Sequence, residues 1–179
     1  GDFDIVIAGM ASTEERLKSV DFSDPYFKQQ QAILIRAEDD ALYNKPEDLS
    51  GHKVGVQNGT IQVPIANELA GEENVVGLVK AQDLIMELKS GNIEALAVAY
   101  GNAEMIVDAN PDLVICTWEF DVKAEYSANV IMMQKGETEL LDAVNAILAQ
   151  AKEANLYDGW YKDAVELGKS ENAQELTLN

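Results

Sequence analysis

The stretch GMASTEERLKSVDFSDPY, residues 9–26, decides the fold of this chain of 179 residues. It follows residues 4–8, DIVIA, a short apolar run that predicts a buried strand. We expect Gly9 to end this strand. Ser12 and Thr13 are both residue types that cap the N-terminus of a helix, and the two glutamates after them suit a first helical turn, where the helix dipole favours negative charge. The stretch therefore predicts a strand, a tight turn and the start of a helix.

Arg16 places a positive charge just after the expected helix start. A strand that ends at a glycine, a helix N-terminus with free N–H groups and a fixed guanidinium together suit a carboxylate. The same residues also fit a plain strand, turn and helix with a solvated arginine, because arginine is common at protein surfaces. From these residues alone, both interpretations stay open.

The chain carries 13 Lys and Arg against 32 Asp and Glu, a formal net charge of −19. Affinity for nucleic acid comes largely from cationic contacts with phosphate, so this balance argues against a nucleic-acid-binding protein. Cys116 is the only cysteine, which excludes an internal disulfide, and its apolar neighbours indicate a core position. His52 is the only histidine, which gives little support to a histidine-based triad or a zinc site. We therefore expect no catalytic residue, no metal and no cofactor.

Strands and helices alternate through the middle of the chain. Apolar runs predict strands at residues 53–57, 75–79, 95–99 and 113–116. Helices are predicted between them at residues 60–70, 81–90 and 102–109. Further strands are predicted at residues 31–35 and 127–133, and the last two helices at residues 137–153 and 158–167. Such alternation forms βαβ units and a mostly parallel sheet.

GMASTEER followed by VDFSDPY resembles the polar amino-acid-binding family of bacterial extracellular solute-binding proteins, the receptors of ABC importers. In that family, this region usually has the sequence G-M-T-I-T-x-E-R followed by D-F-S-x-P-Y. Further matches continue in order along this chain to about Lys169. The resemblance implies an α/β, two-lobed periplasmic-binding-protein-like fold of type 2. The lobes it implies are residues 1–35 with 124–179, and residues 36–123.

The resemblance also implies one group of binding residues in the first lobe. In the family, the arginine that matches Arg16 grips the α-carboxylate of the ligand. The residues that match Gly9, Ala11 and Thr13 add backbone or hydroxyl contacts. The family usually has Ser or Thr where this chain has Ala11, so one hydroxyl is missing here and a backbone N–H is expected in its place.

A second group is implied by residues 57–62, QNGTIQ, which resemble the family's G-T-x loop on the second lobe. The backbone N–H groups of Thr60 and Ile61 open a helix and so suit a carboxylate. The family's side chain at the position of Gln57 often helps to set ligand choice. A purely structural interpretation is equally simple, with Gly59 in a turn and Thr60 as a helix cap.

Ala99 is the main departure from the family pattern. Family members usually have Asp or Glu there, which pairs with the α-ammonium of the ligand. A charge-assisted hydrogen bond of this kind contributes ~1.5–3 kcal/mol, or roughly ten- to a hundredfold in affinity. Three explanations are open: Tyr100 or Asn102 compensates, a part of the family's fold outside this sequence supplies the acid, or the ligand is not a free α-amino acid.

The expected function is that of the substrate-binding component of an ABC importer, which binds an amino acid or a related small carboxylate between two lobes for delivery to a membrane permease. The resemblance implies an extracytoplasmic location, in the periplasm or at the cell surface as a lipoprotein. One alternative is an enzyme on the same fold, similar to cyclohexadienyl or arogenate dehydratases, for which Glu14, Glu15, Asp21 and Asp24 are the acids near the turn. Another is a sensory or scaffold fragment without a ligand.

The resemblance begins partway into the family's first lobe, before which a complete member has a strand–helix–strand portion. The second lobe is therefore expected to be complete and the first partial, as in a truncated form or a natural fragment. An open strand edge would favour a homodimer that shares or exchanges strands. No signal segment starts the sequence, so any targeting sequence is expected to have been removed or to lie outside it.

Overall fold

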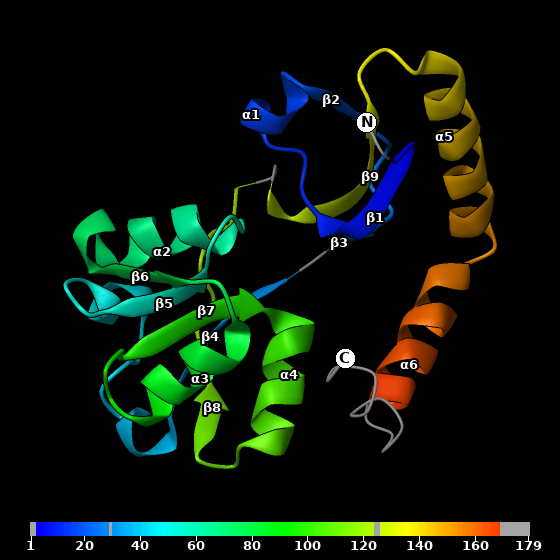
Figure 1. Cartoon of the computed structure of the whole chain (residues 1–179). Helices are drawn as coiled ribbons and strands as arrows, with labels where there is room; N and C mark the ends of the chain where they lie inside the picture. The colour runs from blue at the N-terminus through cyan, green and yellow to red at the C-terminus, as the bar shows by residue number, and fades with distance from the viewer. Residues whose placement is uncertain (1–2, 29, 124–125, 169–179) are drawn as a thin grey trace. The chain divides into compact units, whose positions relative to one another are not determined.

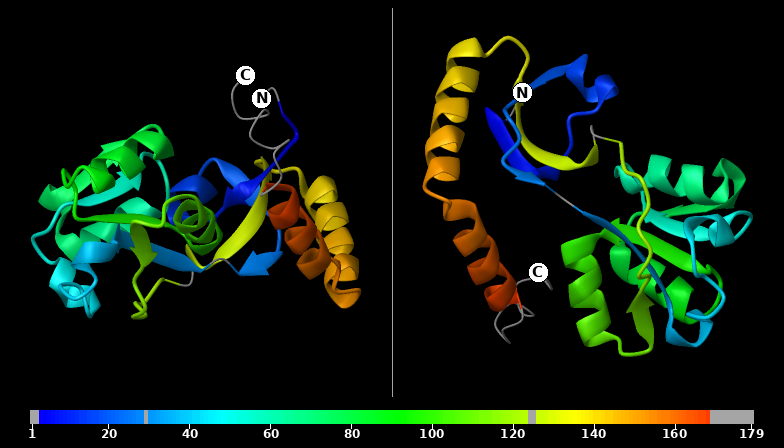
Figure 2. Two further views of the ribbon diagram at one scale, coloured as in Figure 1. Left: turned by 90° about the horizontal axis from the view of Figure 1, so that it is seen from below. Right: turned by 180° about the vertical axis from the view of Figure 1, so that it is seen from behind.

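The structure is a computed structural model that describes residues 3–28, 30–123 and 126–168. It divides into two compact units, Gly1–Lys28 with Ala124–Asn179 and Gln29–Lys123. Figures 1 and 2 show the first unit in dark blue, yellow and orange and the second mainly in lighter blue, cyan and green. Each unit has its own sheet, so the chain enters the second unit once and leaves it once.

The sheet of the first unit is built around one strand, β9 (Ala128–Gln134). β9 pairs antiparallel with three partners: β1 (Ile5–Met10), β2 (Val20–Phe22) and β3 (Phe27–Lys28). The register of β1 shifts between Val6 and Met10, and Gly9 lies in this bulge with φ +57°. The expectation that Gly9 ends the strand is therefore wrong. Its left-handed backbone bends the strand, which continues to Met10.

Three helices belong to the first unit: α1 (Glu14–Leu17), α5 (Thr138–Glu153) and α6 (Leu156–Gly168). The last helix begins two residues before Asp158, so the expected cap at that residue is wrong. The ring of Phe27 attaches α6 to the sheet, because it lies 4.7 Å from the ring of Tyr157 and 5.1 Å from that of Tyr161. None of these three helices has a buried residue among those described.

The second unit has a five-stranded sheet. Its strands are β4 (Gln31–Arg36), β5 (Val54–Gln57), β6 (Val75–Leu78), β7 (Ala95–Ala99) and β8 (Leu113–Ile115). They lie in the order β6-β5-β7-β4-β8. β5 runs parallel to β6 and β7, whereas β4 runs antiparallel to both β7 and β8. The sheet is mostly parallel, as expected, with β4 as its one opposed strand.

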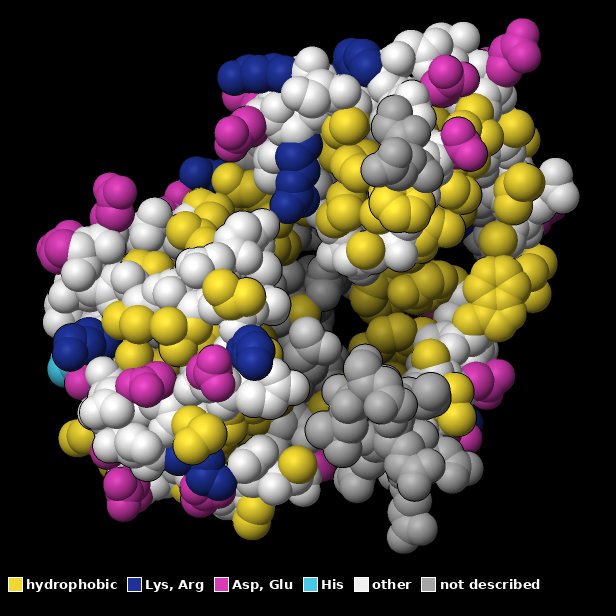
Figure 3. Space-filling view, in the orientation of Figure 1, with side chains coloured by type: hydrophobic (Ala, Val, Ile, Leu, Met, Phe, Trp, Pro, Cys, Tyr) yellow, Lys and Arg dark blue, Asp and Glu magenta, His cyan; other side chains and the backbone are white. Residues whose placement is uncertain are grey.

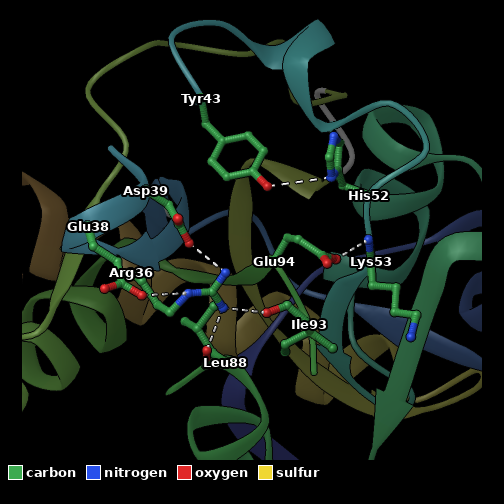
Figure 4. A network of polar contacts seen from close by, with 9 residues as sticks. All are labelled: Arg36, Glu38, Asp39, Tyr43, His52, Lys53, Leu88, Ile93 and Glu94. Carbon is green, nitrogen blue, oxygen red and sulfur yellow. Dashed lines mark hydrogen bonds and ion pairs between the residues drawn. The ribbon is translucent and has the colours of Figure 1, made fainter. Parts of the chain in front are cut away.

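β4 differs from the expected lobe boundary, which placed residues 31–35 in the first lobe. Its hydrogen-bonding partners, β7 and β8, both belong to the second unit. At the end of β4, Arg36 Nη1 donates to the carbonyl oxygens of Leu88 (2.7 Å) and Ile93 (2.9 Å), and Nη2 lies 2.5 Å from Asp39 Oδ2 (Figure 4). These contacts join the end of β4 to residues 88–93, which lie just before β7 in the second unit.

Helices cover both faces of this sheet: α2 (Gln62–Ala70), α3 (Ala81–Lys89) and α4 (Tyr100–Ala109). Three short 3₁₀ helices also belong to the second unit: η1 (Ala37–Asp39), η2 (Pro46–Leu49) and η3 (Glu72–Asn74). Odd-numbered residues of β4 and β7, such as Ile33 and Ala97, pack in one core cluster with α2. Even-numbered residues, such as Leu34 and Leu96, pack in a second cluster with α3 and α4. Whether a residue of β4 or β7 has an odd or an even number therefore indicates the face of the sheet on which its side chain lies.

Large apolar side chains lie at the surface of the first unit, several of them over the region of β1 (Figure 3). Those of β1 and of the residues just before it are Phe3, Ile5 and Ile7. No helix in the described part of the chain is long and apolar enough to cross a membrane.

Candidate ligand-binding site

Arg16 lies on α1 and folds back onto the turn that precedes its own helix. Its Nη1 donates to the carbonyl oxygen of Ala11 at 2.9 Å, and Ala11 is buried. Thr13 is the N-cap residue of α1, as expected, because its Oγ1 accepts from the N–H of Arg16 at 3.3 Å. The guanidinium is therefore held against the backbone and Arg16 is partly buried, an arrangement that favours the binding interpretation over a solvated side chain.

The DFSDPY part of the motif holds this turn on β9. The Oγ of Ser23 accepts from the N–H of Ile131 at 2.9 Å, and the N–H of Tyr26 donates to the carbonyl oxygen of Asn129 at 3.0 Å. Burial raises the pKa of Tyr26, and a hydrogen bond with the backbone of Gly9 acts against this rise. Tyr26 thus positions Gly9, and Ser23 holds the same segment on β9, although sequence reasoning gave neither residue a role. The sequence signal that could have identified these two residues was their place in the DFSDPY motif.

Asp21, one of the acids considered for the enzyme alternative, is engaged in the sheet of the first unit. Its carboxylate accepts from the N–H of Gly136 at 2.8 Å and from Lys135 Nζ at 2.6 Å. These contacts lower the pKa of Asp21 below its ordinary value, the hydrogen bond from Gly136 having the largest effect. A general base at neutral pH needs a raised pKa, so Asp21 is suited to a structural role.

The QNGTIQ loop follows β5 in the second unit. Gly59 takes φ +76°, so it supplies the expected turn. The hydroxyl of Thr60 donates to the carbonyl oxygen of Gln57 at 2.7 Å and closes that turn. The N-cap of α2 is Ile61, which makes no side-chain capping bond, so the expected cap at Thr60 is wrong. Gln57 is exposed, and its Nε2 donates to the carbonyl oxygen of Val79 at 3.0 Å.

Ala99 ends β7 and is also the N-cap of α4, with no side-chain capping bond. It is buried, and it presents only a methyl group. Tyr100 is the first residue of α4, is exposed, and donates its N–H to the carbonyl oxygen of Gln30 at 2.9 Å. Asn102 is exposed on the first turn of α4. A helix N-terminus thus begins at the position where the family pattern has an acid.

Gln31 and Gln62 form a polar contact that sequence reasoning missed. Gln62 Nε2 donates to Gln31 Oε1 at 2.5 Å, and the Gln62 residue is only 8% exposed. Gln31 is the first residue of β4 and Gln62 the first of α2. A polar residue at the start of a predicted strand and another at the start of a predicted helix were the available signals, but nothing local indicated that they meet.

The candidate residues fall into two groups, one in each unit. The group in the first unit consists of Gly9, Ala11, Thr13 and Arg16. The group in the second unit consists of Gln57, Gly59, Thr60, Ile61, Ala99 and Tyr100. Their roles toward a ligand stay predictions. Among residues 3–28, 30–123 and 126–168, no three His, Cys, Asp or Glu side chains are grouped so that they could hold a metal ion.

A hollow of about 730 Å³ lies elsewhere on the second unit, beside η2 and α2. It is lined by Pro46, Glu47, Ser50, Ile65, Glu68, Leu69, Glu119, Phe120 and Asp121. None of the candidate residues borders it. The hollow is therefore separate from both groups of candidate residues.

The chain is similar to curated amino-acid-binding proteins. It is 34% identical over 152 residues to the arginine-binding extracellular protein ArtP of Bacillus subtilis, covering 84% of this chain and 58% of that protein. It is 33% identical over 167 residues to the ABC transporter glutamine-binding protein GlnH of the same species, covering 90% of this chain and 58% of GlnH. The chain thus spans about three fifths of the length of these relatives.

A solved structure gives the same result for the fold. The amino acid ABC transporter substrate-binding protein AbpA of Streptococcus pneumoniae, bound to L-arginine, superposes with a TM-score of 0.85 at 33% identity, covering 94% of this chain and 70% of AbpA. The mixed α/β units fit a partial type 2 periplasmic-binding-protein fold, which confirms the expected fold class.

These relatives are binding proteins, and they give no support to the dehydratase alternative. Residues 1–164 match the family described as bacterial extracellular solute-binding proteins, family 3. The chain therefore belongs to family 3 of the bacterial extracellular solute-binding proteins.

Proposed function

We propose that this chain is the substrate-binding component of an ABC importer and captures an amino acid or a related small carboxylate with groups from both units. The observation that carries the proposal is the fixed guanidinium of Arg16. Its contact with the Ala11 carbonyl orients it beside a turn that Gly9 and Thr13 shape. An arginine held in place loses little freedom when it binds a carboxylate, and a charge-assisted pair of this kind is strong.

Isothermal titration calorimetry with L-arginine, L-glutamine and L-histidine tests this function. Arg16→Ala should weaken binding by at least ~2 kcal/mol, since it leaves a buried carboxylate without its partner. Lys18→Ala is the matched control, because Lys18 is an exposed cation two residues further on, at the end of the same helix. Equal affinities of Arg16→Ala and the unaltered protein would contradict the proposal.

The proposed importer role also implies a partner protein and a cellular location. The family consists of bacterial extracellular solute-binding proteins, ArtP is an arginine-binding extracellular protein, and GlnH is the glutamine-binding protein of an ABC transporter. We infer an extracytoplasmic location, in the periplasm or as a surface lipoprotein, and docking to a membrane permease. The two connections between the units, next to Lys28 and Lys123, are the places for a hinge. Co-purification of the chain with the membrane permease of an ABC importer from the same organism would test the partnership.

We also propose that two copies of the chain associate through the first unit. β1 has β9 as its partner in the described sheet, and Ile7 is 59% exposed on it. An uncharged edge strand with exposed apolar side chains favours pairing with another chain. Sedimentation at micromolar concentration should give a dimer that Ile7→Lys converts to a monomer. A monodisperse monomer of the unaltered protein would refute this association and would leave the ligand proposal standing.

A further inference from the structure

Gln31 and Ala99 lie opposite each other in the antiparallel pair of β4 and β7. Both have odd numbers, like Ile33 and Ala97, which pack in the core cluster with α2. Their side chains therefore take the face of the sheet that α2 covers. Residues directly opposite in an antiparallel pair have Cβ atoms about 4.5–5.5 Å apart, so the Gln31 side chain starts next to the methyl group of Ala99.

Gln62 approaches the same place from the other side. It begins α2, which follows β5, and β7 lies between β5 and β4 in the sheet. The hydrogen bond from Gln62 Nε2 to Gln31 Oε1 therefore spans the end of β7, where Ala99 lies. A methyl group at this position offers neither amide a hydrogen-bonding partner.

The amide pair leaves one strong donor unsatisfied. Gln31 Nε2 exposes less than 1 Å² and has no hydrogen-bond partner in the described part of the chain. A buried donor without an acceptor costs free energy, so such groups in native proteins call for an explanation. A bound molecule that brings an oxygen to Nε2 would remove this cost.

The surroundings of Gln31 favour an oxygen over a cation. The N-termini of α2, nine residues long, and α4, ten residues long, lie beside it, and neither has a side-chain cap. Each helix N-terminus carries a partial positive charge. Gln31, Gln62 and Ala99 contribute no negative charge at this place. An ammonium group placed here would meet a donor and two positive helix ends.

We propose that Gln31 is a specificity-determining residue, held in place by Gln62, and that its Nε2 donates to a carboxylate or carbonyl oxygen of the ligand beside Ala99. The ligand then does not present an ammonium group to this part of the second unit. This inference rests on the proposed ligand-binding function and narrows its ligand class to molecules with an oxygen acceptor at this end.

Calorimetry on the full chain tests the proposal with two matched pairs of probes. The pairs are L-glutamine with glutaramate, and L-arginine with 5-guanidinopentanoate; the second member of each lacks the α-amino group. The protein should bind both members of a pair within about threefold of each other. Gln31→Leu should lose at least about tenfold for both members, as expected for a lost hydrogen bond to a charged group. Gln31→Glu should instead favour the member with the ammonium by at least about tenfold.

Either of two results would contradict the proposal. If the unaltered protein prefers the α-amino acid by more than about tenfold, or if Gln31→Leu leaves all affinities unchanged, the proposal is wrong. A further outcome is that none of the four probes binds the unaltered protein or Arg16→Ala. The proposed ligand-binding function then fails for these ligands, and the ligand part of this inference fails with it.

A second measurement needs no ligand. In ¹⁵N-labelled protein, Gln31→Leu identifies the side-chain amide signals of Gln31. Ala99→Asp should shift these signals and slow their exchange with solvent, because the new carboxylate lies beside Nε2 and accepts from it. Asn102→Asp adds the same charge at an exposed position and serves as the control. Unmoved signals in Ala99→Asp would overturn the placement of the unpaired donor.

Discussion

The two units differ in how they bury their apolar residues. Among the described residues, all but four of the buried hydrophobic residues belong to the second unit; the four in the first are Ala11, Val130, Ile131 and Met133. The second unit is one continuous segment whose helices cover both faces of its sheet. The first unit is made of two separate segments joined at β9, and Ile147 on its longest helix is 64% exposed. The unit formed by one continuous segment is therefore the one with the more complete core.

This difference predicts unequal stability. Burial of apolar surface is the dominant favourable term in folding, at roughly 25 cal/mol per Å². A unit with few buried residues has little to set against the loss of chain entropy. We therefore expect the second unit to fold on its own and the first to be the weaker part of the molecule, unless another surface covers it.

The largest expected effect concerns β4. Residues 29–123, expressed alone, should melt cooperatively, whereas residues 37–123 should not, because removal of β4 takes Ile33, Leu34 and Ile35 out of the core. Circular dichroism during heating would measure both melts. Equal cooperative transitions for the two fragments would mean that β4 is not part of the second unit.

Matched leucine substitutions come next. Leu34→Ala should lower the free energy of unfolding by ~2–5 kcal/mol, because Leu34 is fully buried and its removal leaves a cavity. Leu156→Ala, the same change at an exposed position of α6, should cost less than ~1 kcal/mol. Urea denaturation measures both. Similar costs at the two positions would show that the first unit has a hidden core of its own.

The two tryptophans allow the units to be followed separately. Trp118 lies in the second unit, where its Nε1 donates to the carbonyl oxygen of Tyr43 at 2.9 Å, and Trp160 lies on α6 in the first. In Trp118→Phe the fluorescence reports on the first unit, and in Trp160→Phe on the second. The first should unfold at a midpoint about 1 M urea lower, given the usual dependence of stability on denaturant. Coincident midpoints would show that the units unfold together.

Much of the second unit could be predicted from sequence because its signals are local. The strands expected at residues 53–57, 75–79, 95–99 and 113–116 agree with β5, β6, β7 and β8 to within a residue at either end. Apolar runs mark them. β4 was also placed correctly along the chain, but its neighbours were not, because strand pairing depends on residues more than fifty positions away.

The candidate site shows the same limit. Thr13 was one of two adjacent cap candidates, with Ser12, and the signal was local because the partner of Thr13 is three residues away. Gly9 was taken for a strand end, since a bulge and a stop look alike when the pairing register is unknown. The contact between Gln31 and Gln62 joins residues 31 positions apart, and its meaning depends on Ala99, which lies further along still. Only the folded sheet brings these three together.

The smallest expected effect is a pH dependence, and among the described residues one carboxyl in each unit has a lowered pKa. Asp21 in the first unit has its pKa lowered by Gly136 and Lys135, and Asp112 in the second has its pKa lowered by Lys89. A carboxyl with a lower pKa in the folded than in the unfolded chain stabilises the fold above the unfolded pKa of about 3.9. That contribution is lost as the pH falls through the folded pKa.

Asp21→Asn should therefore reduce the loss of stability of the first unit between about pH 5 and pH 3, followed by the fluorescence of Trp160, and leave the second unit unchanged. Asp112→Asn should do the reverse, followed by Trp118. Both effects should be small, because the two carboxyls lie at the surface and solvent screens them. Asp142→Asn, on the exposed side of α5, is the charge-matched control. If Asp21→Asn changed the acid response of Trp118 as much as that of Trp160, the units would be coupled, and the weak core of the first unit would be supported by the second.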